Sequence, residues 1–386
     1  MSTLKVGGIR GVSASSDAIT VANDGTCTAN ITNNLSNRNL IINGAMRVAQ
    51  RGTSSTSGGY QTVDRFRCNF SGNDENGTQA QHALTSSDTG PYEEGFRFSY
   101  HVTNGNQTSG AGADDAVEFL SKFEAQDIAN SGWDYTSTSS YLTLSFWVKS
   151  SVAQNFFGYI KTADGTPQNF PFQTGSLSAN TWTKITKTIP GNSNLQFDND
   201  ANEGMRITWA AFNGTNRTAS GVSLDTWVAY ADGTRMPDFT STWYTTNDAT
   251  FEITGVQLEV GDHATDFEHR SFADEIIRCE RYYRRDAADG VVYYRFCLGQ
   301  CTSSTGTQAT VKWPTRMRAA PTFATSGTLK GYTVNSQKTP SSFALLDQTT
   351  QGGIVTYSAS GLSAGNCVDL IAGNDGDAYI EFIAEL

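Results

Sequence analysis

The sequence is short of charge, of long apolar runs and of paired cysteines, and each absence excludes a class of protein. Only 17% of its 386 residues are charged. No apolar run approaches the roughly 20 residues of a membrane-spanning helix, so we expect no membrane insertion. The first ten residues lack the apolar core of a signal peptide, so we expect no export signal.

The six cysteines follow no pattern of a disulfide framework or a metal-binding knuckle. Cys297 and Cys301 are separated by three residues, whereas redox and zinc pairs are separated by two. We therefore predict reduced, mostly buried thiols and folding in a reducing cytoplasm. The six are Cys27, Cys68, Cys279, Cys297, Cys301 and Cys367.

The net charge of −11 is concentrated in the middle of the chain. Residues 1–51 are net basic, residues 52–270 are strongly acidic, and residues 291–386 are neutral. An acidic surface repels a phosphate backbone, so we expect no nucleic-acid partner. The same acidic excess also serves solubility, which is the simpler interpretation.

The residues that are abundant indicate short strands joined by turns. Ser, Thr, Asn and Gly occur throughout, whereas Leu, Lys and Glu are sparse. Residues 141–149 place Leu142, Leu144, Phe146 and Val148 on one face of a predicted strand. Many such segments with Asp-Gly and Asn-Gly turns predict a sandwich or jelly roll.

These patterns predict an all-β chain in four parts. The parts are an N-terminal arm (1–38), a jelly-roll β-sandwich (39–270), a connecting segment with one short amphipathic helix (271–290) and a smaller C-terminal β-sandwich (291–386). In the arm, short β-prone pieces alternate with turns, and none can bury a core alone.

Residues 271–286 have the signals of a helix. Ser271 is placed to cap it, with Asp274 in the acidic position of a capping box. One apolar stripe recurs with helical spacing and consists of Phe272, Ile276, Cys279 and Tyr283. A short helix is marginal alone, so its stripe must pack on a domain or on copies of itself.

The sequence offers no convincing catalytic or metal-binding motif. The four histidines have no metal-ligand spacing, and we interpret His101 as a solvated side chain on the polar face of a strand. Asp198, Asp200 and Asn202 alternate as in a calcium loop, but the glycine falls one place late and the distal Glu is absent. A structural Ca²⁺ is therefore a minor alternative, and we expect no cofactor and no enzymatic activity.

Aromatic residues are the more informative signal for binding. Two pairs lie in polar loop sequence, Trp133 with Tyr135 and Trp243 with Tyr244. A ring in a loop can stack on the apolar face of a sugar, or it can anchor its own loop, and both interpretations stay open. Three further tryptophans lie inside predicted strands and are interpreted as core: Trp147, Trp182 and Trp209.

Ordered strings at the start, middle and end of residues 39–285 resemble a known family. They are NLIINGAMRVAQRG (39–52), VDRF (63–66), LSFWVKSS (144–151), FEITGVQLEVG (251–261), ATDFEHR (264–270) and CERYY (279–283). They resemble a module of bacteriophage tail-fibre proteins that is similar to carbohydrate-binding jelly rolls, with Asp266 where the family has proline. MRAAPT (317–322) resembles the start of the distal domain of such fibres. The strings are mostly framework, so no binding residue is carried over from them.

The resemblance implies a tail-fibre subunit that attaches the virion to host glycans. Residues 1–38 would dock to other tail proteins, and three chains would pack their helix stripes together. The expected ligand is a host cell-surface polysaccharide or lipopolysaccharide, and the subunit would assemble in the bacterial cytoplasm. A capsid-bound head fibre or decoration protein is the alternative, and a polysaccharide depolymerase is a third.

Overall fold

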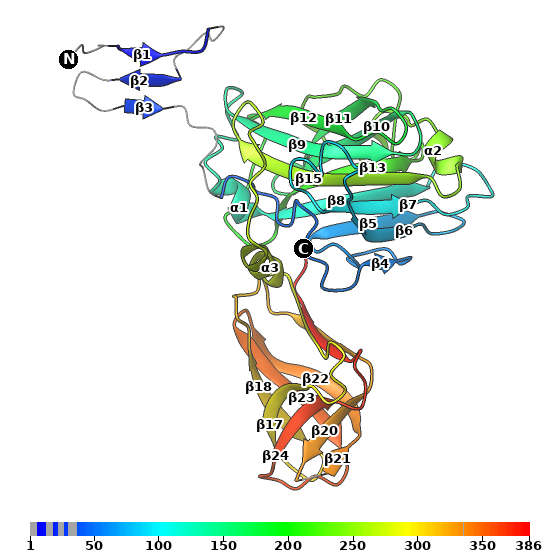
Figure 1. Ribbon diagram of the computed structural model, residues 1–386, viewed down its shortest axis with the longest axis vertical. Helices are drawn as coiled ribbons and strands as arrows, with labels where there is room; N and C mark the ends of the chain where they lie inside the picture. Colours follow the sequence, from blue (N-terminus) through cyan, green and yellow to red (C-terminus); the bar gives the residue numbers. More distant parts are fainter. Residues whose placement is uncertain (1–5, 13–17, 22–26, 30–36, 335) are drawn as a thin grey trace.

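The chain folds almost entirely as β-sheet. The structure, a computed structural model, describes residues 6–12, 18–21, 27–29, 37–334 and 336–386. Several antiparallel sheets are accompanied by three short α-helices (Figure 1), which confirms the predicted all-β class. None of the helices in these ranges combines the length and apolar character that a membrane span requires.

The N-terminal arm forms a small sheet of its own. Its strands β1 (Gly8–Ile9), β2 (Ile19–Val21) and β3 (Cys27–Ala29) pair antiparallel in sequence order. Figure 1 shows this sheet standing apart from the body of the molecule, at the opposite end from the last strands of the chain. The predicted turn at residues 24–25 lies outside the described residues.

Two six-stranded antiparallel sheets form the central sandwich. The first sheet has the order β14 (Val228–Ala229), β11 (Gln168–Ser176), β10 (Asn155–Thr162), β13 (Glu203–Asn213), β8 (Ala116–Glu124) and β5 (Phe66–Ser71). The second sheet has the order β12 (Thr183–Pro190), β9 (Tyr141–Ser150), β15 (Thr250–Val260), β7 (Phe98–Thr103), β6 (Thr78–Ala83) and β4 (Ser54–Ser55). Short helices lie between strands: α1 (Ala125–Ala129), a 3₁₀ turn (Asp232–Thr234) and α2 (Thr242–Thr245).

The inner faces of these sheets form one core. The four alternating apolar residues of β9, Leu142 to Val148, are all buried, as their period of two predicts. Trp209 of β13 is at the centre, with ring centroids of Phe119 and Phe146 at 6.1 Å and 5.8 Å. The interpretation of Trp209 as a core residue is therefore correct.

The connecting helix is shorter than predicted. Helix α3 spans Phe272–Glu280, and Ser271 caps it by accepting the Asp274 N–H at 3.1 Å, as expected. The prediction that Tyr283 continues the helical stripe is wrong, because this residue begins strand β16 (Tyr283–Ala287). Pairing of β16 with the last strand of the chain satisfies its backbone and ends the helix.

The predicted helix stripe is divided between two environments. Cys279 and Tyr283 are buried within their own chain, and Ile276 is half-buried. Phe272 is exposed, and so is Ile277, which the predicted stripe did not include. A stripe of all four predicted residues therefore cannot face other copies of the chain.

The C-terminal part consists of two further sheets. A three-stranded sheet has the order β16, β25 (Tyr379–Ile383) and β19 (Thr322–Ser326). A seven-stranded sheet has the order β21 (Ser336–Lys338), β20 (Leu329–Thr333), β24 (Cys367–Ala372), β17 (Arg295–Cys301), β18 (Thr307–Lys312), β23 (Gly352–Ala359) and β22 (Pro340–Thr349). The prediction that the final segment belongs to a sheet is confirmed by β25.

The last residues of the chain return to the central sandwich. Glu385 forms ion pairs with Arg65 and with Arg51, the latter at 3.3 Å, and Lys122 donates to the Leu386 carbonyl at 3.0 Å. Beside them, Arg281 holds both carboxylate oxygens of the buried Glu124 at 2.6 Å. We call this contact between sandwich and C-terminal part the junction.

The described cysteine side chains are free thiols. Cys68, Cys279 and Cys301 are buried, Cys297 is half-buried, and Cys367 is exposed. Burial raises the pKa of the Cys68 thiol to about 12, so this thiol is protonated and inert at neutral pH. The expectation of reduced, mostly buried cysteines is confirmed for these five residues.

A buried carboxyl near the junction makes stability depend on pH. Burial raises the pKa of Asp64 from 3.8 to about 6, even though Gln50 donates to both of its oxygens. Because the folded pKa lies above the unfolded one, folding is favoured at low pH and penalised as pH rises through 6. Relative to Asp64→Asn, we expect the wild type to lose about 2 kcal/mol of unfolding free energy between pH 4 and 7.5. Urea denaturation of both proteins at the two pH values measures this loss, and a constant difference would contradict it.

Candidate functional site

The first predicted pair of binding aromatics anchors its own loop. Trp133 is 3% exposed, and its indole N–H donates to the Ser140 carbonyl at 3.2 Å. Tyr135 is half-buried and packs edge-on against Phe197, with ring centroids 5.0 Å apart. The loop-anchoring interpretation left open by the sequence therefore describes this pair, and the buried Trp133 has no free ring face for a sugar.

The second predicted pair lies in the core. Trp243 and Tyr244 are both 0% exposed. Trp243 donates to the Thr250 carbonyl at 3.0 Å, and Tyr244 stacks on Phe212 with centroids 4.3 Å apart. Helix α2 turns both rings inward, which the polar flanking sequence concealed. Both residues are thus corrected from candidate ligand contacts to core residues.

The half-buried tryptophans of the sandwich, Trp147 and Trp182, lie instead on the outer face of the second sheet. Trp147 is on β9, and Trp182 directly precedes β12. The interpretation of both as core residues is correct only in part: neither belongs to the core between the sheets, but both are partly buried against a small apolar cluster of Ala45, Leu84 and Phe96. For Trp147 the signal was present in the sequence, because it is out of phase with the alternating apolar residues of β9 and must point to the opposite face.

Each of these indoles is held by a carboxylate and accompanied by a lysine. The Trp147 N–H donates to Glu94 at 3.0 Å, and the Lys184 ammonium lies 5.7 Å from the ring centroid of Trp147. The Trp182 N–H donates to Asp88 at 2.9 Å. Both carboxylates come from the segment between β6 and β7, which follows this face of the sheet.

A glycine lets this segment approach the indole. Gly90 has a φ of +97°, and a Cβ atom there would lie 2.7 Å from the Trp147 ring. Any other residue at this position would meet both backbone strain and a clash with a rigid ring. The close contact between residues 84–97 and Trp147 therefore requires a glycine at position 90.

Charged side chains continue the row across the sheet. Lys149 on β9 lies opposite Glu252 on β15, which lies opposite His101 on β7. Lys149 pairs with Glu252 at 3.0 Å and with Asp88 at 2.9 Å. Only tertiary pairing of β9, β15 and β7 brings these residues together, because they are far apart in the sequence. We use the name outer row for the following set of residues: Trp147, Trp182, Lys184, Lys149, Asp88, Glu252, His101 and His82.

Glu252 is the buried centre of the outer row. Its carboxylate accepts the Ser99 hydroxyl at 2.7 Å and lies near His82 and His101. Burial alone would raise the pKa of Glu252, but the two imidazoles and the Lys149 charge lower it, so it is ionised at neutral pH. The contact with Glu252 raises the pKa of His82. The interpretation of His101 as solvated is wrong, since its side chain is only 16% exposed.

The structure does not favour the calcium loop considered from the sequence. Asn202 donates through its backbone and its side-chain amide to the two oxygens of Asp200, so this carboxylate is engaged within its own loop. Within the described part of the chain, three or more His, Cys, Asp or Glu ligand atoms converge only at His82, His101 and Glu252.

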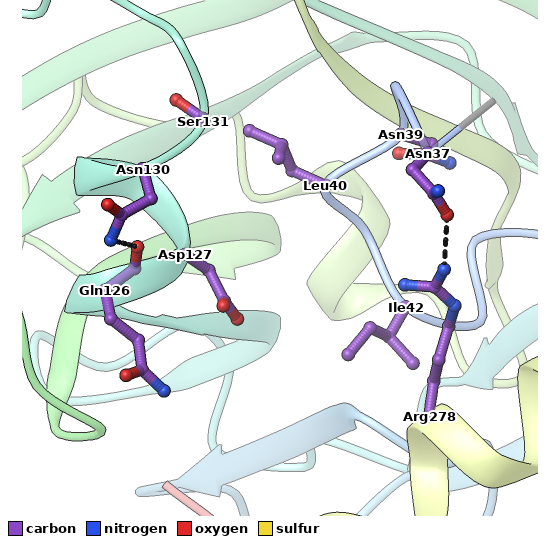
Figure 2. Close-up of a pocket in the computed structure, with 9 residues that line it drawn as sticks. All are labelled: Asn37, Asn39, Leu40, Ile42, Gln126, Asp127, Asn130, Ser131 and Arg278. Atoms are coloured by element: carbon purple, nitrogen blue, oxygen red, sulfur yellow. Dashed lines mark hydrogen bonds between the residues drawn. The ribbon is translucent and has the colours of Figure 1, made fainter. Parts of the chain in front are cut away.

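A cavity of about 430 Å³ lies where the arm meets the sandwich. Figure 2 shows Leu40 and Ile42 on one side of it and Gln126 and Asp127 of α1 on the other. Its lining is mostly amide, hydroxyl and carboxylate groups, and the described residues that line it include no aromatic ring. The described lining of the cavity therefore offers no aromatic ring on which a sugar could stack.

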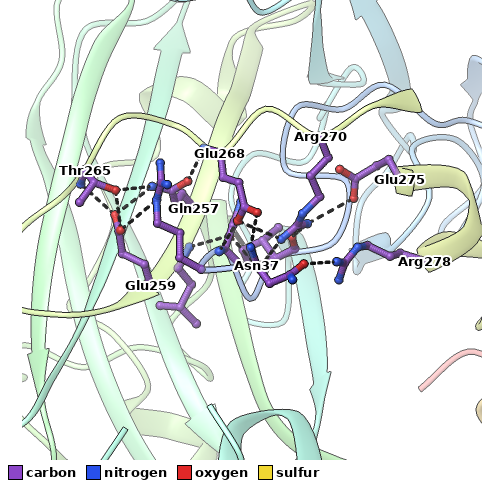
Figure 3. Close-up of polar contacts among 12 residues, drawn as sticks. Asn37, Gln257, Glu259, Thr265, Glu268, Arg270, Glu275 and Arg278 are labelled. Atoms are coloured by element: carbon purple, nitrogen blue, oxygen red, sulfur yellow. Dashed lines mark hydrogen bonds and ion pairs between the residues drawn. The ribbon is translucent and has the colours of Figure 1, made fainter. Parts of the chain in front are cut away.

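The residues beside this cavity join the two ends of the sandwich sequence. The backbone N–H groups of Asn37 and Asn39 donate to Glu268 at 2.6 and 2.7 Å, and Figure 3 shows Asn37 beside this carboxylate. Arg270 donates to the carbonyls of Asn39 and Ile41. We call this set the clamp. The clamp joins residues 39–52, the first string on which the resemblance rests, to residues 264–270, one of the later strings.

Comparison with known proteins finds similarity only among solved structures. No family model matches the chain, and no curated protein matches it in sequence. One similar structure is the enzymatically active domain of tailspike protein 4 of bacteriophage CBA120, with 10% identity and a TM-score of 0.30 over 58% of this chain and 21% of that one. The matched region is thus about a fifth of the tailspike chain.

Two further similar structures are sugar-binding modules. A family 16 carbohydrate-binding module has 10% identity and a TM-score of 0.26, covering 57% of this chain and 99% of the module. A putative sugar-binding protein from Bacteroides thetaiotaomicron has 12% identity and a TM-score of 0.29, covering 58% of this chain and all of that one. Similarity at this level does not assign the chain to a family.

Proposed function

We propose that this protein is a bacteriophage tail-fibre subunit that binds host cell-surface glycans through the outer row. The observation that carries the proposal is the pair of half-buried indoles, Trp147 and Trp182, beside lysines and carboxylates. Aromatic rings stack on the apolar faces of sugars, and charged groups around them hydrogen-bond the hydroxyls.

The layout of the chain supports an attachment role. The arm stands apart from the sandwich at one end, and the C-terminal sheets extend at the other (Figure 1). In this proposal residues 1–38 dock to other virion proteins, and the subunit assembles in the bacterial cytoplasm. Three chains associate with the exposed Phe272 and Ile277 of α3 between them. Three copies of a weak glycan site then act together, which gives avidity without tight individual binding.

Substitution of the outer-row tryptophans tests the proposal. We expect Trp147→Ala and Trp182→Ala each to weaken binding to polysaccharides and lipopolysaccharides on a bacterial glycan array about tenfold or more, because each removes a stacking surface. Tyr230→Ala is the matched control, since Tyr230 is a half-buried aromatic that directly follows β14 of the first sheet. Circular dichroism of every variant verifies that it is folded.

Two results would overturn the proposal. One is glycan binding that survives both tryptophan substitutions unchanged. The other is release of new reducing ends from a bound polysaccharide, since the proposal is recognition without bond cleavage.

A further inference from the structure

Two histidines and a glutamate of the outer row converge on the outer face of the second sheet, whereas the glycan proposal rests on the two indoles. His82 is on β6, His101 on β7 and Glu252 on β15, three strands that lie side by side. Their ligand atoms all lie within 4.8 Å of one another. Nδ1 of His82 is 3.3 Å from one oxygen of Glu252, and Nδ1 of His101 is 3.4 Å from the other.

We propose that His82, His101 and Glu252 bind a divalent transition metal of the zinc class. Zinc bonds to imidazole nitrogen and carboxylate oxygen are about 2.1 Å long, so neighbouring ligands of a tetrahedral site are about 3.4 Å apart. The two nitrogen–oxygen distances, each to a different oxygen of Glu252, are close to this value. His82 is half-exposed on its side chain and can close the remaining distance by a small rotation.

The surroundings of His101 leave one nitrogen for the ion. Its Nε2 lies 2.9 Å from the Thr103 hydroxyl, while its Nδ1 is buried and faces Glu252 at 3.4 Å. In the tautomer that carries its proton on Nε2, His101 donates to Thr103, and the lone pair of Nδ1 then faces the Glu252 carboxylate. In this tautomer the Nδ1 atom of His101 and the facing oxygen of Glu252 repel each other, and a cation bound between them makes the arrangement favourable. The Thr103 contact is the kind of outer hydrogen bond that orients metal-bound imidazoles.

The neighbouring charges are compatible with an ion. Lys149 is a nearby cation, and Asp88 pairs with it at 2.9 Å. Lys149 also pairs with Glu252 at 3.0 Å, through the oxygen near His101, so Asp88 and Glu252 share the charge of this lysine. Ser99 donates at 2.7 Å to the Glu252 oxygen that lies near His82, and this bond fixes the direction of the carboxylate. Three protein ligands leave a fourth position open for water or an oxygen ligand.

Zinc binding by the full chain tests the proposal without any glycan. After dialysis against a chelator, we expect isothermal titration with zinc chloride to show a site that His82→Ala and His101→Ala each weaken at least tenfold. His263→Ala and His269→Ala are matched controls, because they are the other histidines of the chain and lie outside the cluster. We expect both controls to bind zinc as the wild type does.

A thermal readout separates this site from zinc bound elsewhere, for example at thiols. Zinc should raise the melting temperature of the wild type and of both controls, and the rise should disappear in the His82→Ala/His101→Ala variant. Equal zinc affinity in all variants, or no zinc uptake by the wild type, would overturn the proposal. Glycan binding is measured separately in chelator, so failure of one proposal does not imply failure of the other.

Discussion

Arg270→Ala is expected to destabilise the protein by about 3 to 5 kcal/mol, which is the cost of removing one partner from a buried charge network. Arg270 is only 7% exposed on its side chain. It faces Glu268 at 3.4 Å and Glu275 at 3.6 Å, and it donates to two backbone carbonyls of the first string. Without it, two carboxylates and two carbonyls lose their shared donor in a water-poor site.

Two further variants isolate the role of the guanidinium. Arg270→Lys keeps the charge but not the planar fork of donors, so we expect it to lose most of the same stability. Arg278→Ala is the control, because this half-buried arginine makes its hydrogen bond to Asn37 at the exposed edge of the clamp and should cost less than about 1 kcal/mol. Urea denaturation of the four proteins measures these differences. An Arg270→Ala protein within 1 kcal/mol of the wild type would show that the clamp does not hold the sandwich.

Glu124→Ala should be the most damaging change at the junction, with a loss of about 3 kcal/mol. Glu124 is fully buried, and it accepts the Tyr282 hydroxyl as well as both nitrogens of the Arg281 fork, all at 2.6 Å. The substitution leaves a buried hydroxyl and a half-buried guanidinium without their acceptor. Because these residues connect the sandwich to β16, we also expect faster proteolysis within residues 281–290.

The pH dependence of this effect has a definite sign. Burial alone would raise the pKa of Glu124, but the bonds from Arg281 and Tyr282 lower it. Its stabilising contribution is therefore present above the unfolded pKa of 4.5 and lost as pH falls through the folded value. The difference between wild type and Glu124→Ala should shrink below pH 4.5. Glu280→Ala, which removes an i,i+4 pair with Arg284, is the control and should cost under about 1 kcal/mol.

The errors made from the sequence have a common physical origin. Polar neighbours suggested that Trp243 was exposed, yet helix α2 turns it inward. A strand context suggested that Trp147 was buried, yet its phase on β9 points it outward. In both cases the local type of structure was the weaker guide, and the direction of the side chain decided burial.

Periodicity and turn chemistry were sufficient for the class of fold and for much of its local structure. The period of two on β9, the Ser271 cap of α3 and the final strand β25 all depend on neighbours in the chain, and all were predicted. The outer row, the clamp and the junction were not predictable in this way. Each consists of residues from strands or segments distant in sequence, and their distances are set by strand register and sheet order. Local sequence thus determined which segments become strands, and only the tertiary pairing of those strands decided which charges and rings meet.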